Sequence, residues 1–405
     1  MSSPAQKKPR DLRLDFFRGL GMFIIFIAHV PLNAWNEWIP ARFGASDATE
    51  IFVFCSGMAS AIAFGAVFRE RSWWLGAART AYRVWQVYWA HIALFLVTVS
   101  VLVVLDNMVG EDFYTNRLYV RPFFEMPAEH LLGLMTLQYV PNYFDILPMY
   151  LVLLAMMPLV AWLGLRNRWA AFAFIGGIWL LAQFDVIQFS AEVRPGVERE
   201  WFFNPFGWQL VFFTGFAFMM GWLPAPPRRR WLIILAVAVL VFNLVIASRW
   251  GYQYSQSVYD FRDATWSLLE KTDQGLYRYT HFLALAYLSF LLAGEGGRRL
   301  AGAGIWGEFV AVVRKVGQQS LAVFLASMVL AQIAGAALDA AGRTPITVAL
   351  ANLCGFGAII VVAYVAAWFK SQPWRKPAHP AGAGAGAAAR HVPTTEVRGR
   401  EPVRA

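Results

Sequence analysis

The chain has 405 residues, of which 58% are hydrophobic and only 15% are charged. A soluble globular domain carries about 25% charged residues, so this composition excludes a soluble enzyme, and its apolar content excludes a disordered chain. The formal net charge is +10. A nucleic-acid partner is one explanation for such a charge. The positions of the basic residues along the chain show whether it applies.

Aromatic side chains make up 16% of the chain, including 18 Trp and 33 Phe. Aromatic residues line the two water interfaces of a membrane, so this content suits a protein with two such interfaces. The two cysteines, Cys55 and Cys354, lie in apolar stretches, which supports neither a disulfide framework nor a metal cluster. We therefore expect an integral membrane protein without a metal site.

Ten stretches of the chain are long and apolar enough to approach a transmembrane helix, which needs about 20 mostly apolar residues. Strands of a membrane β-barrel would instead show shorter runs of strict alternation. The ten stretches are 14–34, 49–68, 82–105, 146–165, 169–188, 206–223, 231–247, 277–293, 319–338 and 345–369. The sequence therefore predicts an all-α membrane protein, a polytopic bundle of about ten transmembrane helices.

The basic residues are distributed unevenly over the loops between these helices. With the N-terminus inside, the inner segments hold 23 Lys and Arg and the outer loops hold 10. Lys and Arg gather in cytoplasmic loops, so both termini are expected in the cytoplasm, and the charge indicates topology rather than nucleic-acid binding. We expect a cytoplasmic tail at 1–11, a transmembrane domain at 12–370 and a disordered Ala/Gly-rich cytoplasmic tail at 371–405.

The first predicted helix carries three ionisable residues, Asp15, Arg18 and His29. Eleven residues separate Arg18 from His29, which is close to three helical turns, so the two share a face about 16 Å apart. Asp15 lies on the same stripe and is placed to pair with Arg18. Ionisable groups inside spans are functional candidates. The plainer interpretation is that Arg18 reaches the cytoplasmic interface and His29 bonds a neighbouring helix.

The second predicted helix opens with Asp47 and, three residues later, Glu50. This spacing is typical of N-terminal capping, which needs no further function. The alternative is that Glu50 faces the same cavity as His29 and orients or charges it.

Arg79 and Arg83 are i, i+4 neighbours at the cytoplasmic start of the third predicted helix. Two guanidiniums on one face form a fork for phosphates. The alternative is that they only set the topology and contact lipid headgroups.

Three predicted outer loops mix aromatic side chains with amides, carboxylates and bases, a composition typical of both a sugar-binding platform and an aromatic belt. Their candidate binding residues, with Asp47, are Tyr139, Asn142, Asp145, Asn204, Lys271, Arg278 and His281. On the inner side, the polar group Gln318, Gln319 and Ser320 opens the ninth predicted helix. These three either meet a ligand or cap the helix.

These motifs resemble a known family. Arg18 and His29 resemble the R-x10-H signature of membrane acyltransferase family three, and Arg79 and Arg83 are similar to arginines of that family. Longer phrases over residues 11–375 resemble one branch, the OpgC family of succinyltransferases for osmoregulated periplasmic glucans. These phrases are RLDFFRG, FIAHVP, SDATEIFVFCSG, YVPNYFDILPMY, FFNPFGWQL and VGQQSLAVF. Ser327 departs from the wider family, which often has His at this point.

The resemblance implies a multi-pass protein of the bacterial inner membrane, in contact with lipid, that binds acyl-CoA from the cytoplasm and a glucan from the periplasm. His29 would be the essential residue where they meet, as base or acyl acceptor, with Glu50 or Asp145 on its other nitrogen. Arg18, Arg79, Arg83 and residues 318–320 would bind the coenzyme A thioester. A succinyl donor brings a free carboxylate, for which Lys271 or Arg278 is a candidate partner. The alternative is that both bases only pair with local acids.

Three classes of function compete on this sequence. The leading one is an O-acyltransferase that moves a succinyl or similar group from acyl-CoA to glucan hydroxyls, without a metal or nucleic acid. The second is a transporter or flippase for an anionic metabolite or acyl donor, against which the lack of an evident internal repeat counts. The third is a non-catalytic scaffold of the glucan machinery. A homodimer is compatible with each of them.

Overall fold

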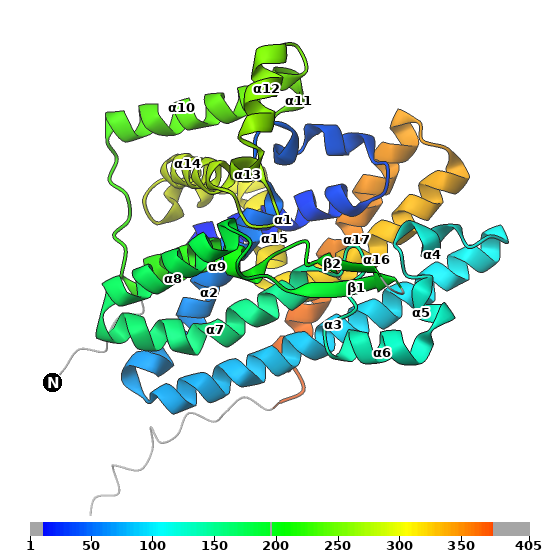
Figure 1. Ribbon diagram of the computed structural model, residues 1–405, viewed down its shortest axis with the longest axis horizontal. Helices are drawn as coiled ribbons and strands as arrows, with labels where there is room; N and C mark the ends of the chain where they lie inside the picture. Colours follow the sequence, from blue (N-terminus) through cyan, green and yellow to red (C-terminus); the bar gives the residue numbers. More distant parts are fainter. Residues whose placement is uncertain (1–10, 195–196, 376–405) are drawn as a thin grey trace, which may run out of the picture. The chain divides into compact units, whose positions relative to one another are not determined.

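The computed structural model describes residues 11–194 and 197–375, and side chains outside 192–198 (Figure 1). The predicted tails at 1–10 and 376–405 lie outside the described residues. The chain divides into two compact units, Met1–Ala367 and Trp368–Ala405. The first unit carries the helices that are relevant to function.

Each of the ten predicted stretches falls on a long helix. These are α1 (Leu12–His29), α2 (Ala48–Glu70), α3 (Trp73–Val109), α7 (Ile146–Arg166), α8 (Arg168–Gln183), α9 (Pro205–Met220), α10 (Arg230–Ile246), α14 (Leu276–Ala293), α16 (Ser320–Ala341) and α17 (Pro345–Ser371). Among the described residues, five helices are long and apolar enough to cross a membrane, namely α2, α3, α7, α16 and α17. The protein is therefore a helical membrane protein, and the total of about ten spans stays a prediction.

The shorter helices fill the connections. They are η1 (Ala34–Trp38), η2 (Pro40–Arg42), α4 (Phe113–Arg117), α5 (Pro122–Glu125), α6 (Pro127–Met135), α11 (Arg249–Tyr252), α12 (Gln256–Ala264), α13 (Trp266–Leu269), η3 (Glu295–Leu300) and α15 (Gly304–Gln318). The described residues also contain one β-hairpin, which the sequence does not predict. Strand β1 (Ser190–Arg194) pairs antiparallel with β2 (Val197–Glu200), with Ser190 opposite Glu200.

The helix α15 corrects the boundary predicted for the polar group at 318–320. Gln318 is the last residue of α15, Ser320 is the first residue of α16, and Gln319 lies at the junction. The group therefore closes one helix and opens the next, rather than opening a single helix.

Small residues let two helix pairs approach closely. A Cβ on Gly19 of α1 would overlap the Val313 carbonyl of α15, and a Cβ on Gly57 of α2 would overlap the Phe212 carbonyl of α9. Such contacts through glycine are the usual way in which membrane helices pack without a hydrophobic driving force. They hold α1 against α15, and α2 against α9.

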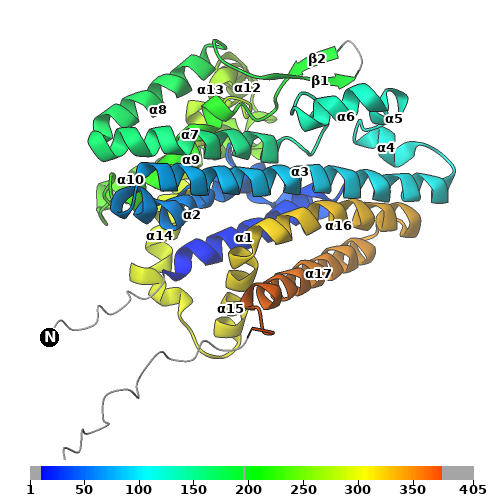
Figure 2. The ribbon, with the colours of Figure 1, turned by 90° about the horizontal axis from the view of Figure 1, so that it is seen from below.

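The connections of the first unit gather at two ends of the helices (Figure 2). One end, called here the loop end, holds α4–α6 and the β1–β2 hairpin together with the connections 30–47 and 247–275. The opposite end, called the turn end, holds the short connections 71–72, 167 and 221–229. The residues predicted to bind substrate therefore share the loop end.

Candidate functional site

The start of α2 is built as the sequence predicts. The Asp47 side chain accepts a hydrogen bond from the Thr49 amide at 2.7 Å, and Glu50 accepts one from the Asp47 amide at 2.8 Å. Together they form a capping box. The prediction of capping is confirmed, and the same two carboxylates also take part in a wider network.

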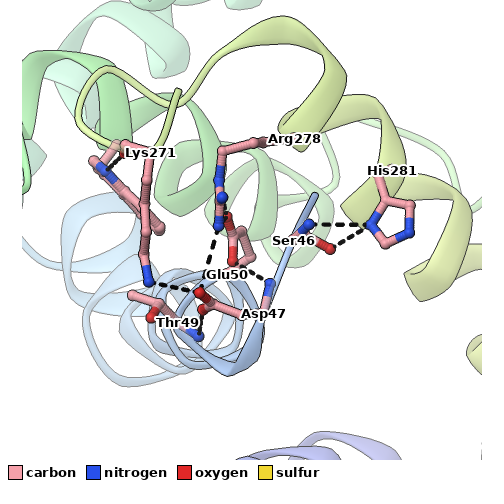
Figure 3. A network of polar contacts seen from close by, with 8 residues as sticks. Ser46, Asp47, Thr49, Glu50, Lys271, Arg278 and His281 are labelled. Carbon is pink, nitrogen blue, oxygen red and sulfur yellow. Dashed lines mark hydrogen bonds and ion pairs between the residues drawn. The ribbon is translucent and has the colours of Figure 1, made fainter. Parts of the chain in front are cut away.

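That network, called here the ion-pair cluster, consists of Asp47, Glu50, Lys271 and Arg278 (Figure 3). Arg278 Nη2 lies 2.8 Å from Glu50 Oε1 and 3.5 Å from Asp47 Oδ2. Lys271 Nζ lies 2.5 Å from Asp47 Oδ2. Burial acts to raise the pKa of Asp47, but the charges of Lys271 and Arg278 outweigh it and hold the pKa well below its usual range. The two bases expected to meet a substrate carboxylate are therefore paired with acids of the chain.

The loop that carries Lys271 is anchored to neighbouring helices. Trp208 Nε1 donates to the Lys271 carbonyl at 2.9 Å, and Asn204 Nδ2 donates to Asp273 Oδ1 at 2.7 Å. Burial raises the pKa of Asp273 to about 6, with Glu270 adding to the rise and the Asn204 hydrogen bond opposing it. Asn204 is only 1% exposed, which favours a structural role for it over the predicted contact with substrate.

His281 reaches the start of α2 from α14. Its Nδ1 accepts a hydrogen bond from the Ser46 amide at 3.2 Å and lies 2.7 Å from Ser46 Oγ (Figure 3). His281 therefore helps to fix the residue that precedes the capping box.

His29 is the last residue of α1 and is partly exposed at the loop end. Its Nδ1 lies 2.7 Å from the Ile25 carbonyl oxygen, and its ring lies 5.2 Å from the ring of Tyr143. Lys271 and Asp47 are within electrostatic range of the imidazole. The predicted pairing of His29 with Glu50 or Asp145 is wrong, because the Ile25 carbonyl takes that nitrogen and both carboxylates have other partners.

Asp145 belongs to a second polar group. Arg199 donates to Asn142 Oδ1 at 2.9 Å and lies 3.4 Å from Asp145 Oδ1. Burial raises the pKa of Asp145 to about 7, although the charge of Arg199 acts to lower it. Tyr139 is 1% exposed, and its hydroxyl donates to the Tyr119 carbonyl at 3.3 Å. Its burial counts against the predicted contact of Tyr139 with sugar.

The charged residues of α1 nearer the turn end contact α2 and α15. Arg18 donates to the Cys55 carbonyl at 3.3 Å and to the Gly317 carbonyl at 3.4 Å. Gln318 Nε2 donates to Asp15 Oδ2 at 3.1 Å. Arg18 is therefore engaged with backbone carbonyls of two helices, which ties its position to theirs.

Arg79 and Arg83 do not form one group with Arg18. Arg79 lies over the ring of Phe64, at 5.4 Å, and Phe64 is nine residues beyond Cys55 on α2. Nine helical residues rise about 13 Å, so Arg79 lies well toward the turn end from Arg18. Arg83 donates to Gln86 Oε1 at 3.2 Å. Neither Arg79 nor Arg83 is ion-paired with a carboxylate of the described residues.

The junction between α15 and α16 is mainly structural. The Gln319 amide donates to the Val316 carbonyl at 3.1 Å, and the Gln319 carbonyl accepts from Val323 at 3.0 Å. Gln319 is 8% exposed. Gln319 occupies the N-cap position of α16, but its side chain makes no capping hydrogen bond there. The contact of the polar group with coenzyme A stays a prediction.

Sequence reasoning missed two residues that the structure brings to the site, Arg199 and Tyr143. Arg199 comes from the hairpin, and its partners are more than fifty residues away in the sequence. Tyr143 has a positive φ of 74°, which is unusual for a residue other than glycine and is common at functional sites. Neither feature has a local sequence signal that could have identified it.

Fold and site together define a class. It is a helical membrane protein with a candidate general base, His29, at a loop end rich in polar side chains, and with two arginines toward the opposite end that pair with no carboxylate of the described residues. Within that class the chain belongs to the OpgC protein family, whose sequence model matches residues 10–371. This confirms the resemblance drawn from the motifs, and membership supports a glucan-modifying acyltransferase in general. Searches of curated proteins and of solved structures found no match.

Proposed function

We propose that the protein is an integral membrane O-acyltransferase that moves a succinyl or similar acyl group from cytoplasmic acyl-CoA to hydroxyls of periplasmic glucans. In this proposal it lies in the bacterial inner membrane with both termini in the cytoplasm. The loop end then faces the periplasm and the turn end faces the cytoplasm. The excess of basic residues on the segments of the turn end supports this orientation.

The observation that carries the proposal is the hydrogen bond of His29. A carbonyl oxygen only accepts, so the bond to Ile25 at 2.7 Å requires the hydrogen on Nδ1. In the neutral imidazole, Nε2 is then the acceptor nitrogen. A backbone carbonyl thus fixes the tautomer that a general base needs, the role that a carboxylate has in a catalytic triad.

The reaction follows from that tautomer. Nε2 takes the proton of a sugar hydroxyl as the oxygen attacks the thioester carbonyl carbon and a C–O bond forms. The tetrahedral intermediate collapses, the C–S bond breaks, and the thiolate of coenzyme A takes the proton from Nε2. If His29 instead accepts the acyl group first, an acyl-imidazole precedes the ester.

The donor side of the proposal rests on Arg79 and Arg83. Coenzyme A is strongly anionic through its phosphates, and guanidiniums without a carboxylate partner suit such a ligand. Arg79 is exposed, and Arg83 is partly exposed. Arg18, held by two backbone carbonyls, lies between these arginines and His29 along the path that the thioester arm would follow.

The acceptor side of the proposal rests on a hollow at the loop end. This hollow has a volume of about 410 Å³, and its lining residues are Arg199, Glu200, Trp201, Phe202 and Thr272. Lys271 lies 5.8 Å from the Phe202 ring, so the hollow adjoins the ion-pair cluster. Aromatic faces beside charged hydrogen-bonding groups are a suitable surface for sugar rings.

The experiment is direct acyl transfer. Purified protein in detergent is incubated with succinyl-CoA and neutral glucan, and both free thiol and glucan ester are followed, the ester by mass spectrometry. We expect ester from the wild type and none above background from His29→Ala. Rapid quenching detects an acyl-enzyme if His29 acts as a relay. A transporter would move substrate in vesicles without cleaving thioester, and that outcome, or equal ester from both proteins, would sink the proposal.

A further inference from the structure

A second set of charges lies at the loop end, apart from the ion-pair cluster. Arg117, the last residue of α4, has its Nη1 3.1 Å from Asp339 Oδ2 on α16. Arg343, just beyond α16, is ion-paired with the other oxygen of the same carboxylate. Two guanidiniums therefore share one acid.

The two arginines differ in what they have left to donate. Arg343 donates to the Pro31 carbonyl at 2.8 Å, to the Leu32 carbonyl at 3.3 Å and to the Gly335 carbonyl at 3.3 Å. It therefore holds the end of α1 against α16. Arg117 uses only Nη1, because its Nε and Nη2 are buried without a hydrogen-bond partner among the described residues. Unpaired buried donors are costly and call for an explanation.

The unpaired side of Arg117 has the geometry that binds carboxylates. Nε and Nη2 form one edge of the guanidinium, and two parallel N–H donors on one edge match the two oxygens of a carboxylate. Asp106, an acid of α3 beside the start of α4, accepts from the Tyr114 amide at 2.6 Å and from the Thr115 amide at 3.1 Å and hydroxyl at 2.6 Å. It is thus already satisfied by the start of α4.

Arg117 is close to His29 through two neighbours. Its charge acts on the Tyr143 hydroxyl, opposing the rise that burial causes in the pKa of that group. The Tyr143 ring lies 5.2 Å from the His29 ring. In addition, the point where a Cβ on Gly335 would lie is 2.7 Å from Pro31 Cδ and 3.6 Å from Arg117 Nη2. Pro31 is two residues beyond His29.

We propose that the Nε–Nη2 edge of Arg117 binds the free carboxylate of a dicarboxylic acyl group whose thioester carbon lies at His29. The inference rests on the proposed acyl transfer and names its donor class. The carbonyl and carboxylate carbons of a succinyl chain are only about 4 Å apart, three single bonds, so the carboxylate of a donor held at His29 stays near that residue. Arg117 Nη2 lies near Pro31, two residues beyond His29, because both are beside Gly335. Lys271 and Arg278 are less suited, because Lys271 pairs with Asp47 and the Nε and Nη2 of Arg278 are already used by Glu50 and Asp47.

The test compares succinyl-CoA with butyryl-CoA, in which a methyl group replaces the carboxylate. We expect Arg117→Gln in the full-length protein to lower kcat/KM for succinyl transfer about 100-fold, as loss of a charged bidentate contact does. Butyryl transfer should stay within about threefold of wild type, since it lacks the contact. The matched control is Arg121→Gln. Like Arg117, Arg121 lies between α3 and α7, but its side chain is more exposed and pairs with Asp112 and Glu125. It should leave the succinyl-to-butyryl ratio unchanged.

Two further measurements cover a variant that fails to fold. Arg117→Lys keeps a charge for Asp339 but lacks the paired edge, and we expect it to lower the ratio about tenfold. The wild type alone should use the thioester of monomethyl succinate no better than butyryl-CoA. The inference is overturned if Arg117→Gln lowers both transfers equally, if the ratio does not change, or if the wild type accepts the methyl ester as readily as succinyl-CoA. A wild type that transfers no acyl group at all contradicts the proposed function itself.

Discussion

The two ends of the first unit differ in how their charged side chains are paired. At the loop end, Asp47 and Glu50 are each in contact with a base, and the four charges of the ion-pair cluster balance. Toward the turn end, Arg79 and Arg83 have an aromatic ring and an amide as neighbours. The ion-pair cluster at the loop end is thus electrostatically complete by itself, whereas Arg79 and Arg83 have no carboxylate partner among the described residues.

This difference has a physical basis. Removing charges from water is expensive, so buried ionic groups persist only where partners compensate them. Glu50 is fully buried and has Arg278 beside it. Arg79 is exposed, so its charge does not carry the cost of burial. The comparison therefore predicts that substitutions in the ion-pair cluster alter stability, while those of Arg79 and Arg83 alter donor affinity.

The largest effect is expected at His29, the candidate base. It belongs neither to the ion-pair cluster nor to the arginines toward the turn end. His29→Ala should lower kcat for acyl transfer about 10²–10⁴-fold, the usual contribution of a general base. Thiol release and ester formation measure it. His130→Ala is a suitable control, because His130 Nδ1 lies 3.0 Å from the Met126 carbonyl in the same i, i−4 arrangement. Similar losses in the two variants would contradict a chemical role for His29.

The next largest effect tests the loop end. Glu50→Gln leaves the buried Arg278 with only Asp47, and removing one member of a buried pair typically lowers the unfolding free energy by about 3–5 kcal/mol. Thermal unfolding in detergent measures the loss. The control is Glu37→Gln, which breaks the exposed pair with Arg42 and should cost at most about 1 kcal/mol. Equal losses would mean that the cluster is not a stabilising unit.

A pH experiment sharpens the same comparison. Burial raises the pKa of Asp145 to about 7 from its ordinary value near 3.8, with Arg199 opposing the rise. The folded state then holds a proton that the unfolded state releases, so stability from this group is present at low pH and declines as pH rises from about 4 to about 7. Asp145→Asn should reduce that decline, by at most about 1.4 kcal/mol per pKa unit removed. An unchanged profile would contradict a raised pKa for this carboxyl.

The smallest effect is expected at the turn end. Arg79→Gln and Arg83→Gln should each raise KM for acyl-CoA about tenfold with little change in kcat, since these charges contact the donor away from the reacting carbon. The effect should shrink as salt is added, because exposed charges are screened. The control is Arg71→Gln, because Arg71 is an exposed arginine in the connection 71–72 that leads into α3. A change in kcat rather than KM would place these arginines elsewhere in the mechanism.

Much of the architecture could be predicted from the sequence, because long apolar runs have few alternatives to helices in a membrane. The capping box at Asp47 and Glu50 was also predictable, since it depends on residues three apart. The helix boundary at Gln318 and Gln319 was not predictable, because α15 ends only one residue before α16 begins and no loop separates the two helices. The separation of Arg18 from Arg79 depends on where α1 and α3 meet α2, which spacing along the chain does not report.

The sequence by itself determined the membrane class and the helical fold, because both follow from its composition and its long apolar runs. Its motifs, through their resemblance to a known family, also identified the family and made His29 the candidate central residue. Only the tertiary structure decided which side chains form hydrogen bonds and ion pairs with each other. In it, His29 Nδ1 bonds the Ile25 carbonyl rather than a carboxylate, and Lys271 and Arg278 pair with acids of the chain. One edge of Arg117 has no hydrogen-bond partner among the described residues. Electrostatic partners are chosen by distance in space, and residues more than two hundred positions apart in the chain meet at 2.8 Å.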